Sequence, residues 1–324
     1  MRDWPTCVIG RAGPARHIPG MSDSMLVFDR AAVRARRDRA AAGYAGFSFL
    51  KQEVAARLAD RLDGINRRFP LALDLGSHDG ALAVALAGRN GIERVIAADL
   101  SPAMAGAARR AGHPALALDE EALPFAAGSL DLVASCLSLH WVNDLPGAFL
   151  QIRQALRPDG LFLAAMLGGT TLVELREVMA QAEIDVEGGL SPRLSPFADV
   201  RDAGGLLQRA GFALPVVDSD WLEVTYDNAL ALMRDLRGMG ETNAHLERRK
   251  GFTKRATLLR AAELYQERFA GPDGRIPATF QVLYLAGWVP DATTQQKPLK
   301  PGSAAARLAE ALGGVEVSTG VKPN

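Results

Sequence analysis

The chain lacks the residues and runs that mark several classes of protein. Its two cysteines, Cys7 and Cys136, are too few for a disulfide framework or a cysteine-rich metal site. It contains no run of about 18 apolar residues, so we expect no transmembrane helix. Lys plus Arg and Asp plus Glu number 37 each, which leaves a formal net charge of zero. Without an overall positive field we expect no nucleic-acid partner, whereas peripheral membrane association through a local patch stays open.

The overall composition is that of a folded globular protein. Hydrophobic residues make up 48% and charged residues 23% of the 324 residues, enough for one α/β domain with a cap. Arginine outnumbers lysine by 31 to 6 and alanine is abundant, which is typical of a GC-rich genome rather than of a nucleic-acid binder. We therefore expect a cytoplasmic protein of a bacterium.

Both ends of the chain lack a periodic pattern. Residues 1–24 are rich in proline and glycine, which predicts a disordered leader, or a translation start at Met21 or Met25 instead of Met1. Residues 290–324 predict a flexible tail. Between the two ends we expect a helical arm, a core of alternating strands and helices, and a region with the remaining strands and a helical cap, over residues 25–66, 67–170 and 171–289.

The arm begins with a basic segment, FDRAAVRARRDRA at residues 28–40, which we interpret as a helix. Its arginines suit either a solvated helix face or a lid or substrate-docking arm. Residues 48–63 place Leu50, Val54 and Leu58 at helical spacing, which predicts an amphipathic helix.

From residue 71 onward, short apolar strands alternate with helices. Because each strand is apolar along nearly its whole length, the alternation predicts an α/β fold with a parallel sheet and helices on both faces. The seven expected strands lie at 71–75, 94–99, 114–118, 130–135, 160–167, 214–218 and 280–288. The helices expected beyond the arm lie at 81–87, 102–111, 144–156, 171–184, 200–210, 226–237 and 257–269, and residues 188–197 are expected to form a loop.

The first strand ends in the turn LDLGSHDG, which contains Asp74, Gly76 and Gly80. A ligand bound at the carboxyl edge of such a sheet approaches the backbone closely where glycine leaves room. The turn does not fit the G-x-G-x-x-G pattern of a dinucleotide site, and Asp79 would repel a pyrophosphate. Asp74 suits a ligand with a positively charged amino group. These features favour S-adenosylmethionine over a nicotinamide dinucleotide.

Acidic residues follow the next two strands as well. Asp99 ends the second strand, where a carboxylate can accept two hydrogen bonds from a ribose diol, although it also suits the cap of the next helix. Asp119 and Glu120 follow the third strand, where an acid can accept an adenine amino group or simply belong to a polar loop.

These segments, with DLVASCLSLHWVNDLP at 131–146 and LRPDGLF at 156–162, resemble the motifs of class I methyltransferases with seven-stranded Rossmann-like sheets. More specifically, the chain is similar to the complex I (NADH dehydrogenase) assembly factor 5 family. That likeness rests on SCLSLHWVNDLP, GGTTLVELR, EGGLSPRLSPF, DLRGMGETN and PATFQVLYLAGW. The biotin-pathway malonyl carrier-protein methyltransferases share a weaker version of these motifs.

The resemblance implies S-adenosylmethionine as cofactor, bound within residues 67–170, with Leu100, Ser135 and Leu137 also lining the pocket. One residue departs from the family pattern: His78 stands where the family has glycine. Its imidazole would either crowd the methionyl part of the cofactor or contact its carboxylate.

Candidate catalytic and substrate residues follow the fourth strand and lie in the cap. His140 is a candidate base or substrate hydrogen-bond partner, and Trp141 and Asn143 lie beside it, over the expected pocket. In the cap, Glu241 suits bidentate pairing with a substrate arginine, with Asn243 nearby. We predict no metal site.

The resemblance implies a protein substrate, an arginine of a respiratory complex I subunit, and associates the family with hydroxylation rather than with a proven methylation. It places eukaryotic members on the matrix side of the mitochondrial inner membrane. Three hypotheses follow: an enzyme that modifies such a substrate, a methyltransferase acting on a malonyl carrier protein or a small molecule, and a non-catalytic assembly chaperone. The acidic residues after the strands favour an enzyme, whereas His78 favours the chaperone.

Overall fold

The computed structural model describes residues 26–197 and 200–291. The predicted leader, its alternative starts Met1, Met21 and Met25, and the tail beyond residue 291 lie outside the described residues. Within the described part, no helix is both long and apolar enough to cross a membrane.

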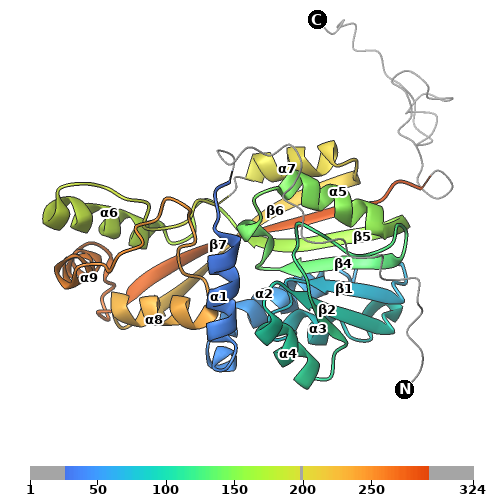
Figure 1. The fold of residues 1–324 in the computed structure, drawn as a ribbon, viewed down its shortest axis with the longest axis horizontal. Coiled ribbons are helices and arrows are strands. Elements are labelled where there is room, and N and C mark those ends of the chain that lie inside the picture. The colour runs from blue at the N-terminus through green and yellow to red at the C-terminus, as the bar shows by residue number, and fades with distance from the viewer. Residues whose placement is uncertain (1–25, 198–199, 292–324) are drawn as a thin grey trace, which may run out of the picture. The chain divides into compact units, whose positions relative to one another are not determined.

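A seven-stranded sheet in the order β3-β2-β1-β4-β5-β7-β6 forms the centre of the fold (Figure 1). The first five strands in this order pair in parallel, and β7 runs antiparallel to both β5 and β6. The strands are β1 (Leu71–Leu75), β2 (Arg94–Asp99), β3 (Ala115–Ala117), β4 (Leu130–Cys136), β5 (Leu156–Leu167), β6 (Ala213–Tyr226) and β7 (Ile276–Trp288). The predicted α/β class and seven strands are therefore confirmed.

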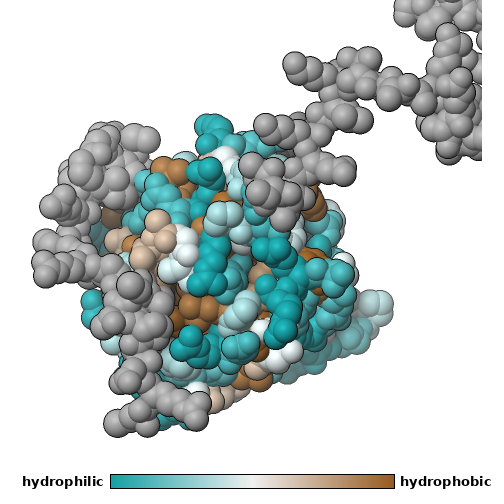
Figure 2. All heavy atoms as spheres, turned by 90° about the vertical axis from the view of Figure 1, so that its right-hand side faces the viewer, coloured by the Kyte–Doolittle hydropathy of each residue, from teal (hydrophilic) through white to brown (hydrophobic). Residues whose placement is uncertain are grey.

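Helices cover both faces of the sheet because its central strands are apolar on both sides. On one face α2 (Phe49–Asp60) and α3 (Ala81–Leu86) pack into one hydrophobic cluster, and on the other α5 (Leu145–Ala155) and α7 (Val200–Arg209) pack into a second. The helix α4 (Pro102–Arg110) packs against β2 and β3. The outer surface on the right-hand side of Figure 1 is mostly hydrophilic, with hydrophobic side chains in small groups (Figure 2).

Local capping explains where these helices begin. The hydroxyl of Ser101 accepts the Met104 N–H at 3.1 Å, and Pro102 follows it in the first turn of α4. The carboxylate of Asp144 accepts the Gly147 N–H at 2.8 Å and caps α5. Ser101 and Asp144 thus account for the starts of α4 and α5.

The two last strands are longer than predicted, and their extensions support the cap. β6 and β7 pair from Ala213↔Trp288 to Tyr226↔Ile276, so Tyr226 ends a strand instead of starting a helix. The cap helices are α6 (Val173–Glu187), α8 (Ala229–Met239) and α9 (Arg255–Phe269). The sequence hid the length of β6 because the polar residues Asp218, Ser219 and Asp220 interrupt the apolar residues of this edge strand.

The basic segment forms α1 (Arg30–Ala40), which contacts both α4 and α8. In Figure 1 it stands between the cap helices and the helices of the core. Asp29 caps it by accepting the Ala32 N–H at 2.9 Å, and Val33 and Arg37 are buried. The segment was predicted to be either a solvated helix face or a lid or substrate-docking arm. Because Arg37 is buried, it does not lie on a solvated face.

Candidate active site

The carboxyl ends of β1, β2 and β4 meet at a tight turn. Gly76 has φ +76°, and a Cβ added there would lie 2.1 Å from the Cβ and Oγ of Ser138. Gly80 has φ +92° and directly precedes α3. Both glycines are therefore required by backbone conformation, and Gly76 also by lack of space.

Asp74, at the end of β1, connects this turn to α3. One carboxylate oxygen accepts the Ala83 N–H of α3 at 3.1 Å, and the other is buried without a hydrogen-bond partner among the described residues. Burial raises the pKa of Asp74 to about 7, although the nearby Lys51 ammonium opposes the shift. The Asp74 carboxyl group therefore helps to hold β1 against α3, with or without a bound ligand.

Asp99 presents a fixed carboxylate at the end of β2. It accepts the backbone N–H of His78 at 3.0 Å and that of Ser101 at 2.8 Å. Its third partner is the guanidinium of Arg37, at 3.4 Å. The position predicted to bind a ribose diol therefore already holds a cation of the same chain.

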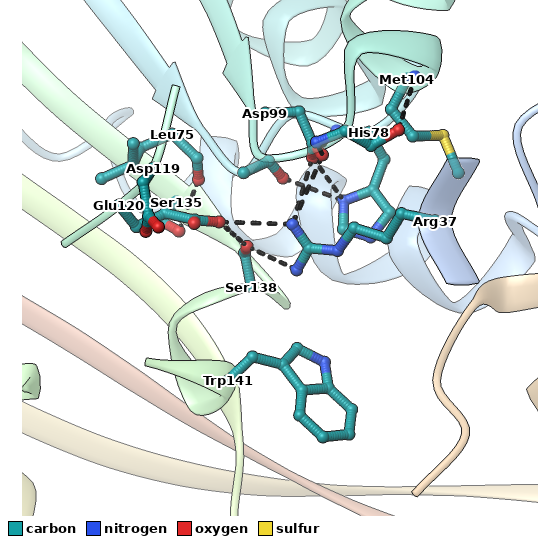
Figure 3. Close-up of polar contacts among 12 residues, drawn as sticks. Arg37, Leu75, His78, Asp99, Met104, Asp119, Glu120, Ser135, Ser138 and Trp141 are labelled. Atoms are coloured by element: carbon teal, nitrogen blue, oxygen red, sulfur yellow. Dashed lines mark hydrogen bonds and ion pairs between the residues drawn. The ribbon is translucent and has the colours of Figure 1, made fainter. Parts of the chain in front are cut away.

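Arg37 joins the acidic groups of the site (Figure 3). Its guanidinium is buried and donates to Glu120 at 3.3 Å and to the Ser138 hydroxyl at 2.9 Å, as well as to Asp99. Arg30 lies at the other side of Glu120 and also donates to Asp119, at 2.7 Å. Burial alone would raise the pKa of Glu120, but Arg30 and Arg37 outweigh it and lower the pKa to about 2. Two arginines of α1 thus neutralise the acidic residues that follow β2 and β3.

His78 is buried with φ +51°, in the left-handed region that favours glycine. Its ring packs against Tyr44 at a centroid distance of 5.3 Å, and its Nδ1 faces the Lys51 ammonium at 2.7 Å. Burial and the charges of Lys51 and Arg37 lower the pKa of His78 well below its usual value, so the imidazole is neutral.

Lys51 places a buried ammonium in the same turn. It donates to the backbone carbonyls of Gly76 at 2.7 Å and Cys136 at 2.8 Å, and to the imidazole of His78. Sequence reasoning missed Lys51, Arg30 and Arg37. The one available signal for Lys51 is its place beside Leu50 on the apolar face of α2, where a charge needs buried partners.

The other predicted pocket residues connect the strand ends. Ser135 donates its hydroxyl hydrogen to the Leu75 carbonyl at 2.7 Å, which ties β4 to β1. Leu137 has φ +46° and lines a hollow beside His78. Leu100 packs on the small cluster that contains Phe28, Val33 and Trp141.

His140 and Trp141 lie in a short 3-10 turn, η4 (Leu139–Trp141), and both meet Glu241 of the cap. The same oxygen of Glu241 lies 3.1 Å from the Nε2 of His140 and 2.9 Å from the indole nitrogen of Trp141, which donates to it. Burial would raise the pKa of Glu241, but His140 and the charge of Arg37 outweigh burial and lower it. Glu241 is therefore a largely buried, ionised carboxylate.

The two asparagines predicted to touch substrate fasten loops of the chain. The side chain of Asn143 accepts the N–H groups of Val27 and Phe28 at 2.9 and 2.7 Å, and so anchors the start of the arm. The amide of Asn243 donates to the Pro192 carbonyl at 2.7 Å, and its oxygen accepts from the hydroxyl of Ser195 at 3.1 Å. Both side chains have their polar groups engaged within the chain.

Two hollows flank Glu241. One, of about 30 Å³, is lined by residues of the turn and arm, including Tyr44, Lys51 and His78. The other, of about 300 Å³, is lined by cap residues and Trp141. Glu241 lines both, so its carboxylate stands between the cofactor side predicted from sequence and the cap.

A His-x-Glu pair, His245 and Glu247, lies in the loop after α8, a spacing that can supply two metal ligands. The Nδ1 of His245 accepts the backbone N–H of Glu247 at 3.0 Å. Within residues 26–197 and 200–291, no group of three or more His, Cys, Asp or Glu side chains is placed to hold a metal ion.

The arrangement matches that of known methyltransferases. A family profile described as "Methyltransferase domain" matches residues 73–164. The crystal structure of the YcgJ protein of Bacillus subtilis shares the fold with a TM-score of 0.51 at 16% identity, over 72% of this chain and 98% of that one. The fold is thus that of the class I methyltransferases.

Full-length relatives define the family more narrowly. The arginine-hydroxylase NDUFAF5 of Danio rerio is 44% identical over 88% of this chain and 89% of its own, and the Homo sapiens protein is 44% identical over 89% and 84%. The malonyl-acyl-carrier-protein O-methyltransferase of Xylella fastidiosa is 38% identical over 82% and 89%. The chain belongs to the NDUFAF5 family of methyltransferase-fold enzymes.

Proposed function

We propose that the protein binds S-adenosylmethionine at the carboxyl ends of β1, β2 and β4 and modifies an arginine side chain of a protein substrate in the assembly of respiratory complex I. The methyltransferase profile and the NDUFAF5 relatives support the enzyme class. We place the protein in the bacterial cytoplasm, or on the matrix side of the inner mitochondrial membrane in a eukaryote, as the mitochondrial relatives suggest.

The residues at the strand ends fit this cofactor chemically. Gly76 leaves no Cβ between the ligand and the backbone, Asp99 can accept hydrogen bonds from a ribose diol, and the Gly76 and Cys136 carbonyls are acceptors suited to an ammonium group. When bound, S-adenosylmethionine supplies an activated methyl group. The chain's own residues orient the ligand and exclude water, which is the main contribution a protein makes in such chemistry.

In this structure Arg37 and Lys51 hold the same acceptors. Arg37 neutralises Asp99, and Lys51 bonds both carbonyls. A ligand with a diol and an ammonium group would therefore have to exchange with these two side chains, its hydroxyls replacing the hydrogen bonds of Arg37 at Asp99 and its ammonium replacing Lys51 at the carbonyls.

Glu241 is the observation that carries the substrate assignment. It is ionised, 13% exposed, and held by His140 and Trp141 at the junction of the two hollows. A desolvated carboxylate favours a guanidinium, which pairs with it through charge-assisted hydrogen bonds. The same charge disfavours the malonyl group of the alternative substrate, because that group carries a carboxylate of its own.

Calorimetric titration with S-adenosylmethionine and S-adenosylhomocysteine tests the cofactor. We expect micromolar binding that Asp99→Asn weakens by tenfold or more, about 1.4 kcal/mol per tenfold. No binding of either compound at millimolar concentration would contradict the cofactor assignment and favour the assembly chaperone.

Mass spectrometry of an arginine-containing complex I subunit peptide tests the reaction. A gain of one methylene or of one oxygen atom at arginine separates methylation from hydroxylation. We expect Glu241→Gln to abolish the modification and to retain cofactor binding, with Glu247→Gln in the neighbouring exposed loop as the matched control. Equal modification by both variants would refute the role of Glu241.

A further inference from the structure

A third hollow, of about 610 Å³, opens beside the cap and is strongly basic. Two of its cations come from α1, one from the loop after α6 and three from the loop before α9, so the cations surround it from three segments. They are Arg36, Arg39, Arg193, Arg248, Arg249 and Lys250.

Ion pairs neutralise only part of this charge. Arg193 and Arg249 share Glu187, Arg193 also binds Glu183, and Arg248 binds Asp29. Among the described residues, no carboxylate lies within ion-pair distance of Arg36, Arg39 or Lys250; Arg36 instead donates to the Thr242 carbonyl at 2.8 Å. Burial, and after it the charge of Arg248, lower the pKa of Arg36 to about 10.

The basic hollow adjoins the 300 Å³ hollow that reaches Glu241. The two share lining residues from α6 and from both loops, among them Met179, Arg193 and Asn243. The inner hollow is lined mainly by apolar side chains such as Leu175, Met233 and Leu236. From the basic hollow inward to Glu241, the lining therefore changes from cations to apolar side chains and ends at an anion.

We infer that the basic hollow docks an acidic segment of the polypeptide substrate whose arginine reaches Glu241. The inference rests on the proposed function for the identity of that arginine, but the acidic segment is indicated by the cations alone. Carboxylates spaced along a peptide match six cations distributed over three segments.

Other anionic partners fit this hollow less well. None of the described residues that line it is aromatic, so they offer no platform on which bases stack. Its inner cations are recessed: the side chains of Arg193 and Arg248 are 10% and 16% exposed and do not reach a flat lipid surface. The fully exposed Phe252 nearby makes anionic vesicles the necessary comparison.

Fluorescence anisotropy on the full chain tests the inference. The probe is a labelled peptide with one central arginine and glutamates on both sides, compared with the same peptide carrying glutamines. The variant Arg39→Glu/Lys250→Glu reverses two exposed charges of the hollow that have no described ion pair, and Arg94→Glu/Arg110→Glu makes the same charge change elsewhere. We expect the acidic peptide to bind more tightly, and the first variant alone to weaken it by about tenfold.

Equal affinity for the two peptides, or equal loss in both variants, would overturn the inference. So would binding of phosphatidylglycerol vesicles that the first variant abolishes while peptide binding persists. Replacing the central arginine with citrulline separates the two hypotheses. If the acidic flanks still govern affinity and the citrulline change has no effect, the docking surface stands and the arginine assignment of the proposed function fails.

Discussion

Single residues decide whether the turn after β1 forms at all. Gly76 has both a left-handed φ and no space for a Cβ, because Ser138 lies against it. We expect Gly76→Ala to lower the free energy of unfolding by about 3 kcal/mol or more, through strain and a steric clash. Urea unfolding of Gly76→Ala against Gly64→Ala checks this, since nothing lies within 4 Å of a Cβ at Gly64. Equal stability of the two variants would contradict the turn geometry.

Arg37 is the residue whose removal has two opposite effects. Arg37→Gln leaves Asp99 buried without its cation and Glu120 paired with Arg30 alone, so we expect a loss of about 3 kcal/mol in unfolding free energy. The same change frees Asp99, so S-adenosylmethionine should bind more tightly to the folded variant. Calorimetry and thermal unfolding measure both effects, and the exposed Arg34→Gln on the same helix should show neither. Weaker cofactor binding in Arg37→Gln would mean that Arg37 contacts the ligand.

At the level of elements, the β1–α3 junction carries a pH dependence. Folding raises the pKa of Asp74 from 3.8 to about 7, so between these values the folded chain retains a proton that the unfolded chain releases. Stability therefore falls as pH rises through this window, and the loss is complete above pH 7. Asp74→Asn has no such proton, and its stability relative to the wild type should increase from pH 4 to pH 8. The exposed Asp202→Asn serves as control in thermal unfolding, and a constant difference for Asp74→Asn would refute the shift.

Elements differ in how far the sequence predicts them. The apolar strands β1, β2, β4 and β5 follow from local pattern, and the predictions that they exist are confirmed. β6 was predicted too short because Asp218, Ser219 and Asp220 interrupt the apolar residues of this edge strand.

The candidate site could be predicted from the sequence only in part, because some of its residues depend on partners far away in the chain. The acids were found because they follow strand ends, which is a local property. The burial of Arg37 depends on Asp99 and Glu120, 62 and 83 residues away, and that of Lys51 on a carbonyl 85 residues away. No local pattern records such partners.

For the whole molecule, ligand binding and the packing of the arm should be coupled. If S-adenosylmethionine exchanges with Arg37 at Asp99, α1 loses its most buried polar anchor. We expect hydrogen exchange of the α1 amides to speed up on binding, while the amides of β1 and β4 are protected further. Exchange that slows in α1 as well would show that the cofactor binds without displacing Arg37. S-adenosylhomocysteine, which retains the diol and amino group, should produce the same pattern.

The segment that the methyltransferase profile covers, residues 73–164, holds Asp99 and Glu120 but none of the cations that neutralise them. Arg30, Arg37 and Lys51 all precede it, and Glu241 follows it. If this segment alone were transferred to another protein, Asp99 and Glu120 would be buried without the arginines that pair with them. Across homologues, the acids after β2 and β3 and the arginines of the arm should be gained and lost together.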